Sequence, residues 1–345
     1  MTESERSATD GALAAVIARM RGVLEPQGPP DPSLERLYGW LRYHLGWAAV
    51  NGVAADTRSA KGTRSRVCVL ACAASGGEPA AAVDAAAAIE LVHEFSLIHD
   101  DIEDADATRR GRPALWTIVG IPQAINAGDA LFALARAAVS HGDHAPAAAM
   151  PDLLRCLDAA CVRLAEGQHL DMALESGAPA DAAAYEAMVA RKTGALLGAS
   201  AAMGAIAAEA PETTRTRLAR WGELVGVAFQ MRDDLLGLWG DPGATGKPAG
   251  NDLVRGKQSL PIVLGLAVPA LAGAIRGCQA PARPSAADVA ACLGAMEEAG
   301  IRARCQAMAA ARAEAALRLL AGAALVPGPA AALAELTRCA VDRDR

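Results

Sequence analysis

The amino-acid sequence predicts an all-α protein. Hydrophobic residues make up 52% of the 345 positions, whereas aromatic residues make up only 3%. Alanine and leucine dominate the apolar residues, and both are strong helix formers. No stretch shows the sustained alternation of apolar and polar residues that marks a half-buried strand. The length alone would permit two domains, but no linker divides the chain convincingly, so we expect one helical domain over residues 1–345.

Proline and glycine separate the expected helices of the N-terminal half. Residues 1–10 are polar and of mixed charge, and we expect them to form a disordered tail. The segment from Pro26 to Pro30 separates the first two helices, and Ser75-Gly76-Gly77 ends the third. Loop 105–121 follows the fourth helix. Helices are expected in this half at residues 11–23, 33–50, 64–75, 79–104, 123–140 and 151–176.

The C-terminal half continues as a series of helices, which brings the expected total to about ten or more. Loop 240–257 is rich in glycine and proline and is a candidate for a mobile lid. Helices are expected at residues 181–208, 213–239, 258–276, 286–298, 301–322 and 329–340.

Composition and charge argue against several classes of protein. The longest apolar run, from Ala80 to Val92, is interrupted by Asp84 and Glu90. It falls short of the ~20 apolar residues of a membrane-spanning helix. The first ten residues differ from a signal peptide, so we expect a cytoplasmic protein. A formal net charge of −6 argues against nucleic acid as a partner.

The cysteines and most histidines show no functional pattern. The eight cysteines form no CxxC pair and have no nearby histidines to complete a zinc site, so we expect reduced core thiols. Four histidines have no chemical context, and we expect them to be structural or surface residues: His44, His141, His144 and His169.

The most informative segment is acidic and ends the expected helix 79–104. In the run from His99 to Asp104, Asp100 and Asp104 are one helical turn apart on the same face, and Asp101 points about 100° away. Mg²⁺ binds through one or two carboxylates together with the phosphates of a substrate. Carboxylates are unfavourable at the negative end of a helix dipole, so their presence there predicts a bound cation.

Basic residues and a second acidic pair extend this pattern. Arg109 and Arg110 follow the acidic run and can donate charge-assisted hydrogen bonds to phosphate oxygens. Asp233 and Asp234 lie near the end of the expected helix 213–239. Two such clusters predict two carboxylate walls that face one Mg²⁺-bound diphosphate.

These motifs resemble those of the trans-isoprenyl diphosphate synthases of the polyprenyl synthetase family. The resemblance runs from about Lys61 to Pro261 and includes both aspartate motifs. It implies a single large helical bundle around a central substrate cavity, and a homodimer. Further segments agree with the family's pattern: Lys61-Gly62-Thr63-Arg64, Ile89 to His93, Ala127 to Ala130, Glu166-Gly167-Gln168 with Asp171, Lys192 to Ala195, and Asp252-Leu253 with Lys257.

The resemblance implies a condensation of isopentenyl diphosphate with an allylic diphosphate, which is dimethylallyl, geranyl or farnesyl diphosphate. The allylic diphosphate ionises, the isopentenyl double bond attacks the cation, and a proton is lost. Mg²⁺, about three ions per active site, assists the departure of diphosphate. The metal ligands would be Asp100, Asp104 and Asp233. Asp101 and Asp234 would either bind metal or orient metal-bound water.

The resemblance also assigns the basic and polar residues. Both diphosphates need charge-assisted donors. His93 lies seven residues before Asp100, about two turns along the same face, which supports its assignment. The allylic diphosphate would be contacted by Arg109, Lys192 and Lys257. The isopentenyl diphosphate would be contacted by Lys61, Arg64, His93 and Arg110. Thr193 and Gln230 would line the reaction centre, and Lys247 in loop 240–257 is a further substrate-binding candidate.

Phe95 is the expected determinant of product length, although it is also an ordinary core residue. It lies five residues before Asp100, and in the family a bulky residue there closes the floor of the chain pocket. Phe95 followed by the small Ser96 resembles the arrangement that forms geranylgeranyl (C20) diphosphate, whereas two aromatic residues would favour farnesyl.

The sequence departs from the family's pattern at several positions. Gly237 replaces the usual third aspartate of the second motif, so metal binding on that side is expected to be weaker. Gly62 and Ser65 replace an arginine and a proline near Lys61, so the isopentenyl site is the less certain of the two.

Two other functions are compatible with parts of the sequence. A terpene cyclase of related fold would ionise an allylic diphosphate alone, but it would not need the second basic set, and residues 251–255 lack the serine and glutamate of its metal motif. A non-catalytic subunit that modulates a partner synthase would be consistent with Gly237, whereas the complete run from Asp100 to Asp104 argues against it.

Overall fold

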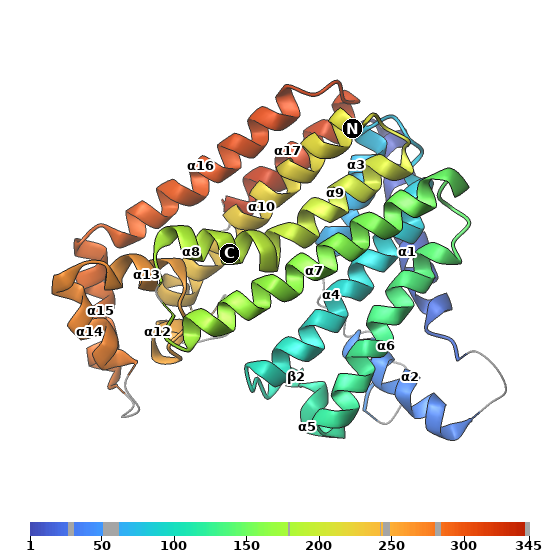
Figure 1. Cartoon of the computed structure of the whole chain (residues 1–345). Coiled ribbons are helices and arrows are strands. Elements are labelled where there is room, and N and C mark those ends of the chain that lie inside the picture. The colour runs from blue at the N-terminus through green and yellow to red at the C-terminus, as the bar shows by residue number, and fades with distance from the viewer. Residues whose placement is uncertain are drawn as a thin grey trace. The chain divides into compact units, whose positions relative to one another are not determined.

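The computed structural model of the chain describes residues 1–26, 31–50, 62–178, 180–241, 243, 249–279 and 284–341 (Figure 1). The fold is all-α, as the sequence predicted. The chain forms two compact units, and each is described by itself. The first comprises Met1–Ala159, Ala199–Arg215 and Ala324–Ala330, and the second Ala160–Gly198, Thr216–Ala323 and Ala331–Arg345. The single domain expected from the sequence stays a prediction.

The first unit is organised around helix α4 (Val83–Glu103). The first half of α4 is buried on all sides, and Ala85 to Ala88 are fully inaccessible. Helix α6 (Ile121–Ser140) packs along α4, and the two run side by side in Figure 1. The remaining elements are α1 (Glu3–Val23), α2 (Pro32–His44), α3 (Thr63–Ala74), the 3₁₀ turns Pro79–Ala82 and Ala147–Ala149, strands β1 (Thr108–Arg109) and β2 (Arg112–Pro113), α5 (Leu115–Val119), the first part of α7 (Met150–Glu175), and α9 (Ala195–Ala207).

Small residues allow the helices of the first unit to pack closely. A Cβ atom at Gly204 on α9 would overlap the backbone carbonyl of Cys68 on α3. A Cβ at Gly128 on α6 would overlap the imidazole of His99 on α4. Helix packing therefore requires glycine at Gly204, whereas a side chain at Gly128 would displace the His99 ring.

The second unit is organised around helix α10 (Glu212–Trp239), whose buried residues include Met231, Leu235 and Leu238. These side chains belong to one hydrophobic cluster together with residues of the later helices. The other elements are α8 (Ala182–Val189), a π-helical segment (Ala190–Gly194), α12 (Asn251–Val254), α13 (Leu260–Leu266), α14 (Pro269–Cys278), α15 (Ala286–Glu298), α16 (Ile301–Ala321) and α17 (Pro327–Val341).

The N-terminal tail expected to be disordered is instead helical. Helix α1 begins at Glu3, and Thr2 and Glu5 form a capping box in which each side chain accepts a hydrogen bond from the other residue's backbone N–H. This reciprocal capping satisfies two backbone donors that would otherwise be unpaired, and so favours a helix start.

Other elements differ from the expected ones in detail. The second helix ends at His44 rather than residue 50, and the expected helix 181–208 is interrupted by the π-helical segment. Loop 105–121 contains a hairpin and the short helix α5. The expected helix 258–276 is divided into α13 and α14 because Pro269 begins a new helix.

The structure bears on two expectations from composition, the absence of a membrane-spanning helix and the reduced state of the cysteines. No helix of the described residues has both the length and the apolar character to span a membrane. The eight cysteines are free thiols, as predicted, but they are not all in the core, because Cys339 is exposed.

Candidate active site

The first aspartate motif lies at the C-terminal end of α4, as the sequence predicted. Asp100 and Asp104 are partly exposed, whereas Asp101 points inward and is 1% exposed. The last turn of α4, which is described in full, contains no basic residue to compensate the helix dipole. Asp100 and Asp104 therefore present oxygen donors of the kind that Mg²⁺ prefers, beside a dipole end that favours a cation.

A short hairpin after α4 carries the predicted arginines. Strands β1 and β2 pair Arg109 with Arg112, so Arg110 and Gly111 form a two-residue loop. Both loop residues have positive φ, 54° and 73°, as a type I′ turn requires. The tight turn sends the side chains of successive arginines in different directions.

Two hairpin arginines bind carboxylates on the buried face of α4. Arg109 donates from Nε and Nη2 to Asp101, with an Nε–Oδ1 distance of 2.8 Å. Arg110 donates to both oxygens of Glu94, over 2.8 Å from Nη2 and 3.2 Å from Nη1. Burial raises the pKa of Asp101, and the Arg109 guanidinium opposes part of that rise. Asp101 is thus held by an ion pair, which favours an orienting role over direct metal binding.

Glu94 and His44 are two residues beside this site that the sequence analysis missed. Glu94 is 2% exposed, and His44 Nε2 lies 3.1 Å from its second carboxylate oxygen. Burial alone would raise the pKa of Glu94, but the neighbouring His44 and Arg110 hold that pKa well below its ordinary value. The sequence contained one signal: Glu94 precedes Asp101 by seven residues and so shares its helix face.

Two residues predicted to bind isopentenyl diphosphate, Arg64 and His93, lie near Glu94 and Arg110. Burial lowers the pKa of His93 well below its ordinary value, and the charge of Arg64 lowers it further, so His93 is neutral at pH 7. Burial also lowers the pKa of Arg64. The Nε–H of Arg64 is buried and has no hydrogen-bond acceptor among the described residues. An unsatisfied buried donor is costly, and a phosphate oxygen would satisfy it. Lys61 lies outside the described residues.

The second aspartate motif also has one outward and one inward member. On α10, Asp233 is partly exposed and Asp234 is buried. Asp234 accepts hydrogen bonds from Tyr185 Oη over 2.6 Å, Leu260 N over 2.8 Å and Gln230 Nε2 over 3.1 Å. Burial raises the pKa of Asp234, and these three donors oppose the rise. Like Asp101, Asp234 has the contacts of an orienting residue.

Three further predicted residues come together in the second unit. Thr193 Oγ1 donates to Gln230 Oε1 over 3.0 Å, and Lys192 Nζ lies 2.6 Å from Asp171 Oδ2. Lys192 and Thr193 both belong to the π-helical segment Ala190–Gly194. Single π turns inside α-helices occur frequently at functional sites, because they redirect side chains locally.

The space beside Gly237 is filled by the carboxylate of another residue. A Cβ atom at Gly237 would overlap Asp252 of α12. The second motif therefore has a carboxylate close to the missing third aspartate, supplied from elsewhere in the chain. Lys257 is half-buried and lies close enough to Asp234 to oppose the rise in its pKa. Lys247 lies outside the described residues.

Phe95 belongs to an aromatic cluster between α4 and α6. Its ring meets Phe132 edge to face at a centroid distance of 5.3 Å, and meets His99 edge to face at 5.7 Å. Such arrangements are the favoured geometry of aromatic pairs. The residue five positions before Asp100 is therefore held in place by two neighbouring rings.

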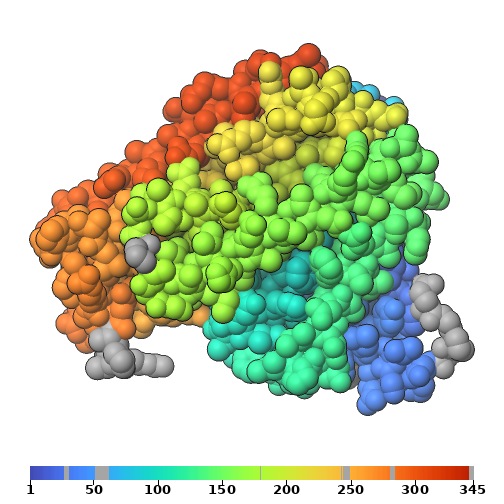
Figure 2. All heavy atoms as spheres, in the orientation of Figure 1, coloured from blue at the N-terminus to red at the C-terminus, as the bar shows by residue number. Residues whose placement is uncertain are grey.

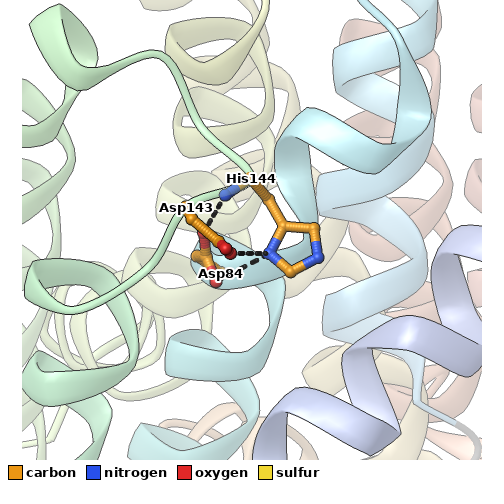
Figure 3. A group of neighbouring side chains, drawn as sticks. All are labelled: Asp84, Asp143 and His144. Atoms are coloured by element: carbon orange, nitrogen blue, oxygen red, sulfur yellow. Dashed lines mark hydrogen bonds and ion pairs between the residues drawn. The ribbon is translucent and has the colours of Figure 1, made fainter.

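A separate cluster of Asp84, Asp143 and His144 lies elsewhere in the first unit (Figure 3). Asp84 precedes Asp100 by sixteen residues on α4, which corresponds to roughly 24 Å along the helix axis. Asp84 accepts from the backbone N–H of His144 over 2.8 Å, and Arg19 Nε lies 3.0 Å from its carboxylate. These contacts join α1, α4 and the segment after α6, so we interpret the cluster as structural.

The two aspartate motifs belong to different units. Asp100 and Asp104 are in the first unit, and Asp233 is in the second. Their arrangement as two walls around one diphosphate stays a prediction.

Comparison with known proteins agrees with the motifs. A model of the polyprenyl synthetase family matches residues 53–295, and so includes both aspartate motifs. The chain belongs to the polyprenyl synthetase family. Dependence on Mg²⁺ is general in this family.

Relatives within the family differ in the product that their names give. A geranylgeranyl diphosphate synthase of Mycobacterium tuberculosis is 44% identical over 72% of this chain and 71% of the relative. A (2E,6E)-farnesyl diphosphate synthase of Mycobacterium bovis is 40% identical over 64% of this chain and 61% of the relative. The crystal structure of a polyprenyl synthetase from Streptomyces coelicolor A3(2) superimposes with a TM-score of 0.87 at 33% identity, covering 96% and 98% of the two chains. Family membership therefore leaves the product length open.

The depressed pKa of His93 predicts a pH dependence of stability. The unfolded state binds a proton at this residue below about pH 6.5, whereas the folded state resists protonation, so stability is lost as the pH falls. Between pH 7.5 and 5.5 this group contributes a loss of at most about 1.4 kcal/mol. His93→Gln, which cannot titrate, should lose correspondingly less stability over this interval, as measured by thermal unfolding at both pH values. Equal losses in the two proteins would contradict the assignment.

Proposed function

We propose that this chain is a chain-elongating prenyltransferase that condenses isopentenyl diphosphate with an allylic diphosphate and releases diphosphate. The main support for the proposal is the arrangement of aspartates and arginines within the first unit. Asp100 and Asp104 project from the end of α4, and the hairpin that follows presents Arg109 and Arg110 from a single tight turn. Carboxylates for a cation and guanidinium groups for phosphate are thus held on adjoining elements.

The residues nearest the leaving diphosphate would act by binding and orientation. Asp100, Asp104 and Asp233 would hold Mg²⁺, which supplies positive charge to the departing diphosphate when bound. Asp101 and Asp234 would orient these ligands and metal-bound water through their buried contacts. Basic residues would bind the remaining oxygens of the allylic diphosphate, and Thr193 with Gln230 would line the reaction centre. The basic residues in this role are Arg109, Lys192 and Lys257, with Lys247 as a further candidate.

The second diphosphate is not ionised and needs cationic donors without a metal. Arg64, His93 and Arg110 would bind it, together with Lys61. The buried Nε–H of Arg64 supports this role, because a phosphate oxygen would supply the acceptor that it lacks among the described residues. Neutral His93 would act as a hydrogen-bond donor rather than as a charge.

Asp252 supports an active enzyme over a non-catalytic subunit. Loss of the third aspartate at Gly237 was the feature that favoured the subunit. The carboxylate of Asp252 lies against the same position, so the acidic character of this end of α10 is retained.

We further propose that the product is geranylgeranyl diphosphate and that the protein is a homodimer. Phe95 and Ser96 support this product, and the 44% identical relative is named a geranylgeranyl diphosphate synthase. Exposed apolar side chains of α6 support the dimer. Ile121, Ile125 and Phe132 are 47%, 41% and 37% exposed and lie within about 40° on one helix face. The green atoms of this helix form part of the surface in Figure 2.

Product analysis tests the proposed reaction. The purified chain with Mg²⁺, isopentenyl diphosphate and either dimethylallyl, geranyl or farnesyl diphosphate should form linear diphosphates that end at C20. Each allylic substrate alone should give no product. Cyclised hydrocarbon from an allylic substrate alone would instead identify a terpene cyclase, and no turnover with any substrate pair would favour a non-catalytic subunit.

Asp100→Ala is the control for this assay. It should lower turnover by about a thousandfold or more, because a preorganised charge contribution of several kcal/mol is lost. Its helical circular dichroism should match that of the unsubstituted protein. Turnover close to the original rate would refute the metal assignment.

Phe95→Ala tests the floor of the chain pocket. Removal of the ring should lengthen the main product by at least one C5 unit, measured by chromatography of the dephosphorylated products. An unchanged distribution in a folded and active variant would locate the floor elsewhere.

The oligomeric state can be measured by sedimentation equilibrium. We expect a mass close to twice the 35.2 kDa of the chain. Ile121→Lys should shift the equilibrium toward the monomer, because it places a charge among the exposed apolar side chains of α6. A monomeric unsubstituted protein would contradict the proposal.

A further inference from the structure

We propose that Glu94, supported by His44, is a positioning residue that orients Arg110 for isopentenyl diphosphate. This inference rests on the proposed function and adds two residues that the family's motifs do not assign. It predicts that a buried carboxylate controls the affinity for one substrate without touching that substrate.

The contact between Glu94 and Arg110 has the geometry of a rigid clamp. The two side chains meet as a fork, with one N–H···O bond to each carboxylate oxygen, at 2.8 Å and 3.2 Å. Their side chains are 3% and 15% exposed, so solvent competes little for these bonds. Bidentate pairs fix the plane of the guanidinium as well as its position. The orientation of Arg110 is therefore set by Glu94.

His44 lies beside the same carboxylate and approaches the oxygen that also accepts from Arg110 Nη1. Its Nε2 lies 3.1 Å from Oε2 of Glu94, and its side chain is 3% exposed. The carbonyl groups of Tyr43 and His44 accept hydrogen bonds from Arg112 of the hairpin, over 2.9 Å and 3.4 Å. The end of α2, the buried face of α4 and the hairpin are thus joined around Glu94.

The backbone of Arg110 explains why such a clamp is needed. Arg110 is a non-glycine residue at φ 54°, a conformation that costs about 1 kcal/mol or more. Its strands contain two residues each and would be only marginally stable alone. The ion pairs from Arg109 to Asp101 and from Arg110 to Glu94 attach the hairpin to α4 at two points.

The clamp leaves Arg110 able to bind an anion. A guanidinium has five N–H donors, and the fork with Glu94 uses two of them. The remaining donors can meet phosphate oxygens, and the charges of Glu94 and Arg110 balance each other. Arg64, which lies near the same cluster, supplies further positive charge. The arrangement orients a phosphate-binding arginine without adding net negative charge beside the substrate.

Glu94→Gln removes the charge and one acceptor while it retains the shape of the side chain. The amide NH₂ would face a guanidinium N–H, so the fork would be lost and Arg110 would adopt several orientations. We expect the KM for isopentenyl diphosphate to rise about tenfold or more, equivalent to ~1.4 kcal/mol. The KM for the allylic diphosphate and kcat should each change less than about threefold. The two KM values and kcat are measured by steady-state assay of the purified chain with Mg²⁺.

Glu186→Gln is the matched control. Glu186 of α8 forms the same kind of fork with Arg312, at 2.6 Å for each bond, in the second unit. This variant loses a bidentate ion pair that is more exposed, at 31% and 32%, and belongs to a different unit from the hairpin, so both KM values should stay unchanged. Equal rises in the two KM values for Glu94→Gln, or no rise in a folded protein, would overturn the inference and leave the proposed function standing.

Arg110→Lys provides a test that a merely structural ion pair would not pass. If Glu94 acts through Arg110, adding Glu94→Gln to Arg110→Lys should raise the KM for isopentenyl diphosphate little further. Independent, multiplicative rises would contradict the inference.

If Glu94→Gln does not fold, His44→Gln takes its place, with an expected rise of about threefold in the KM for isopentenyl diphosphate alone. Absence of condensation by the unsubstituted chain would overturn the proposed function, and this inference with it.

Discussion

The buried carboxylate face of α4 is the constraint on which the candidate site of the first unit depends. Glu90, Glu94 and Asp101 recur at intervals of four and seven residues and so share one side of the helix. Glu90 accepts from the backbone N–H of Ser65 over 2.8 Å, and the other two bind hairpin arginines. Because an unpaired buried charge is costly, these contacts hold α3 and the hairpin against α4. The other aspartates of the same helix end, Asp100 and Asp104, are partly exposed.

The adjacent aspartates of the two motifs illustrate one geometric rule. Consecutive residues on a helix diverge by about 100°, so two neighbouring carboxylates point in different directions. In α4 the inner member, Asp101, is held by a guanidinium, and in α10 the inner member, Asp234, is held by three hydrogen-bond donors. One aspartate of each pair anchors the helix end, and the other remains partly exposed. The pair therefore couples local packing to the position of a metal ligand.

The sequence predicted the features that depend on local spacing. The period of 3.6 residues was enough to predict that Asp100 and Asp104 share a face and that Asp101 does not. The contact between His44 and Glu94 joins residues fifty positions apart, so no local pattern could reveal it. A π turn changes the hydrogen bonding of a helix without changing its composition, and the interruption at residues 190–194 was missed for that reason. The capping box at Thr2 and Glu5 was a local signal that was overlooked among the charged residues.

The proposed binding of two diphosphates is compatible with a net charge of −6, because charges near the candidate site are locally compensated. Glu94 is balanced by Arg110, and Asp101 by Arg109, so the buried carboxylates do not repel an anion at full strength. Arg64 differs, because its buried Nε–H has no acceptor among the described residues and burial lowers its pKa. A group in that condition is stabilised by any anion that reaches it. Arg64 thus keeps a buried N–H donor for an anion, beside the charges of Glu90 and Glu94.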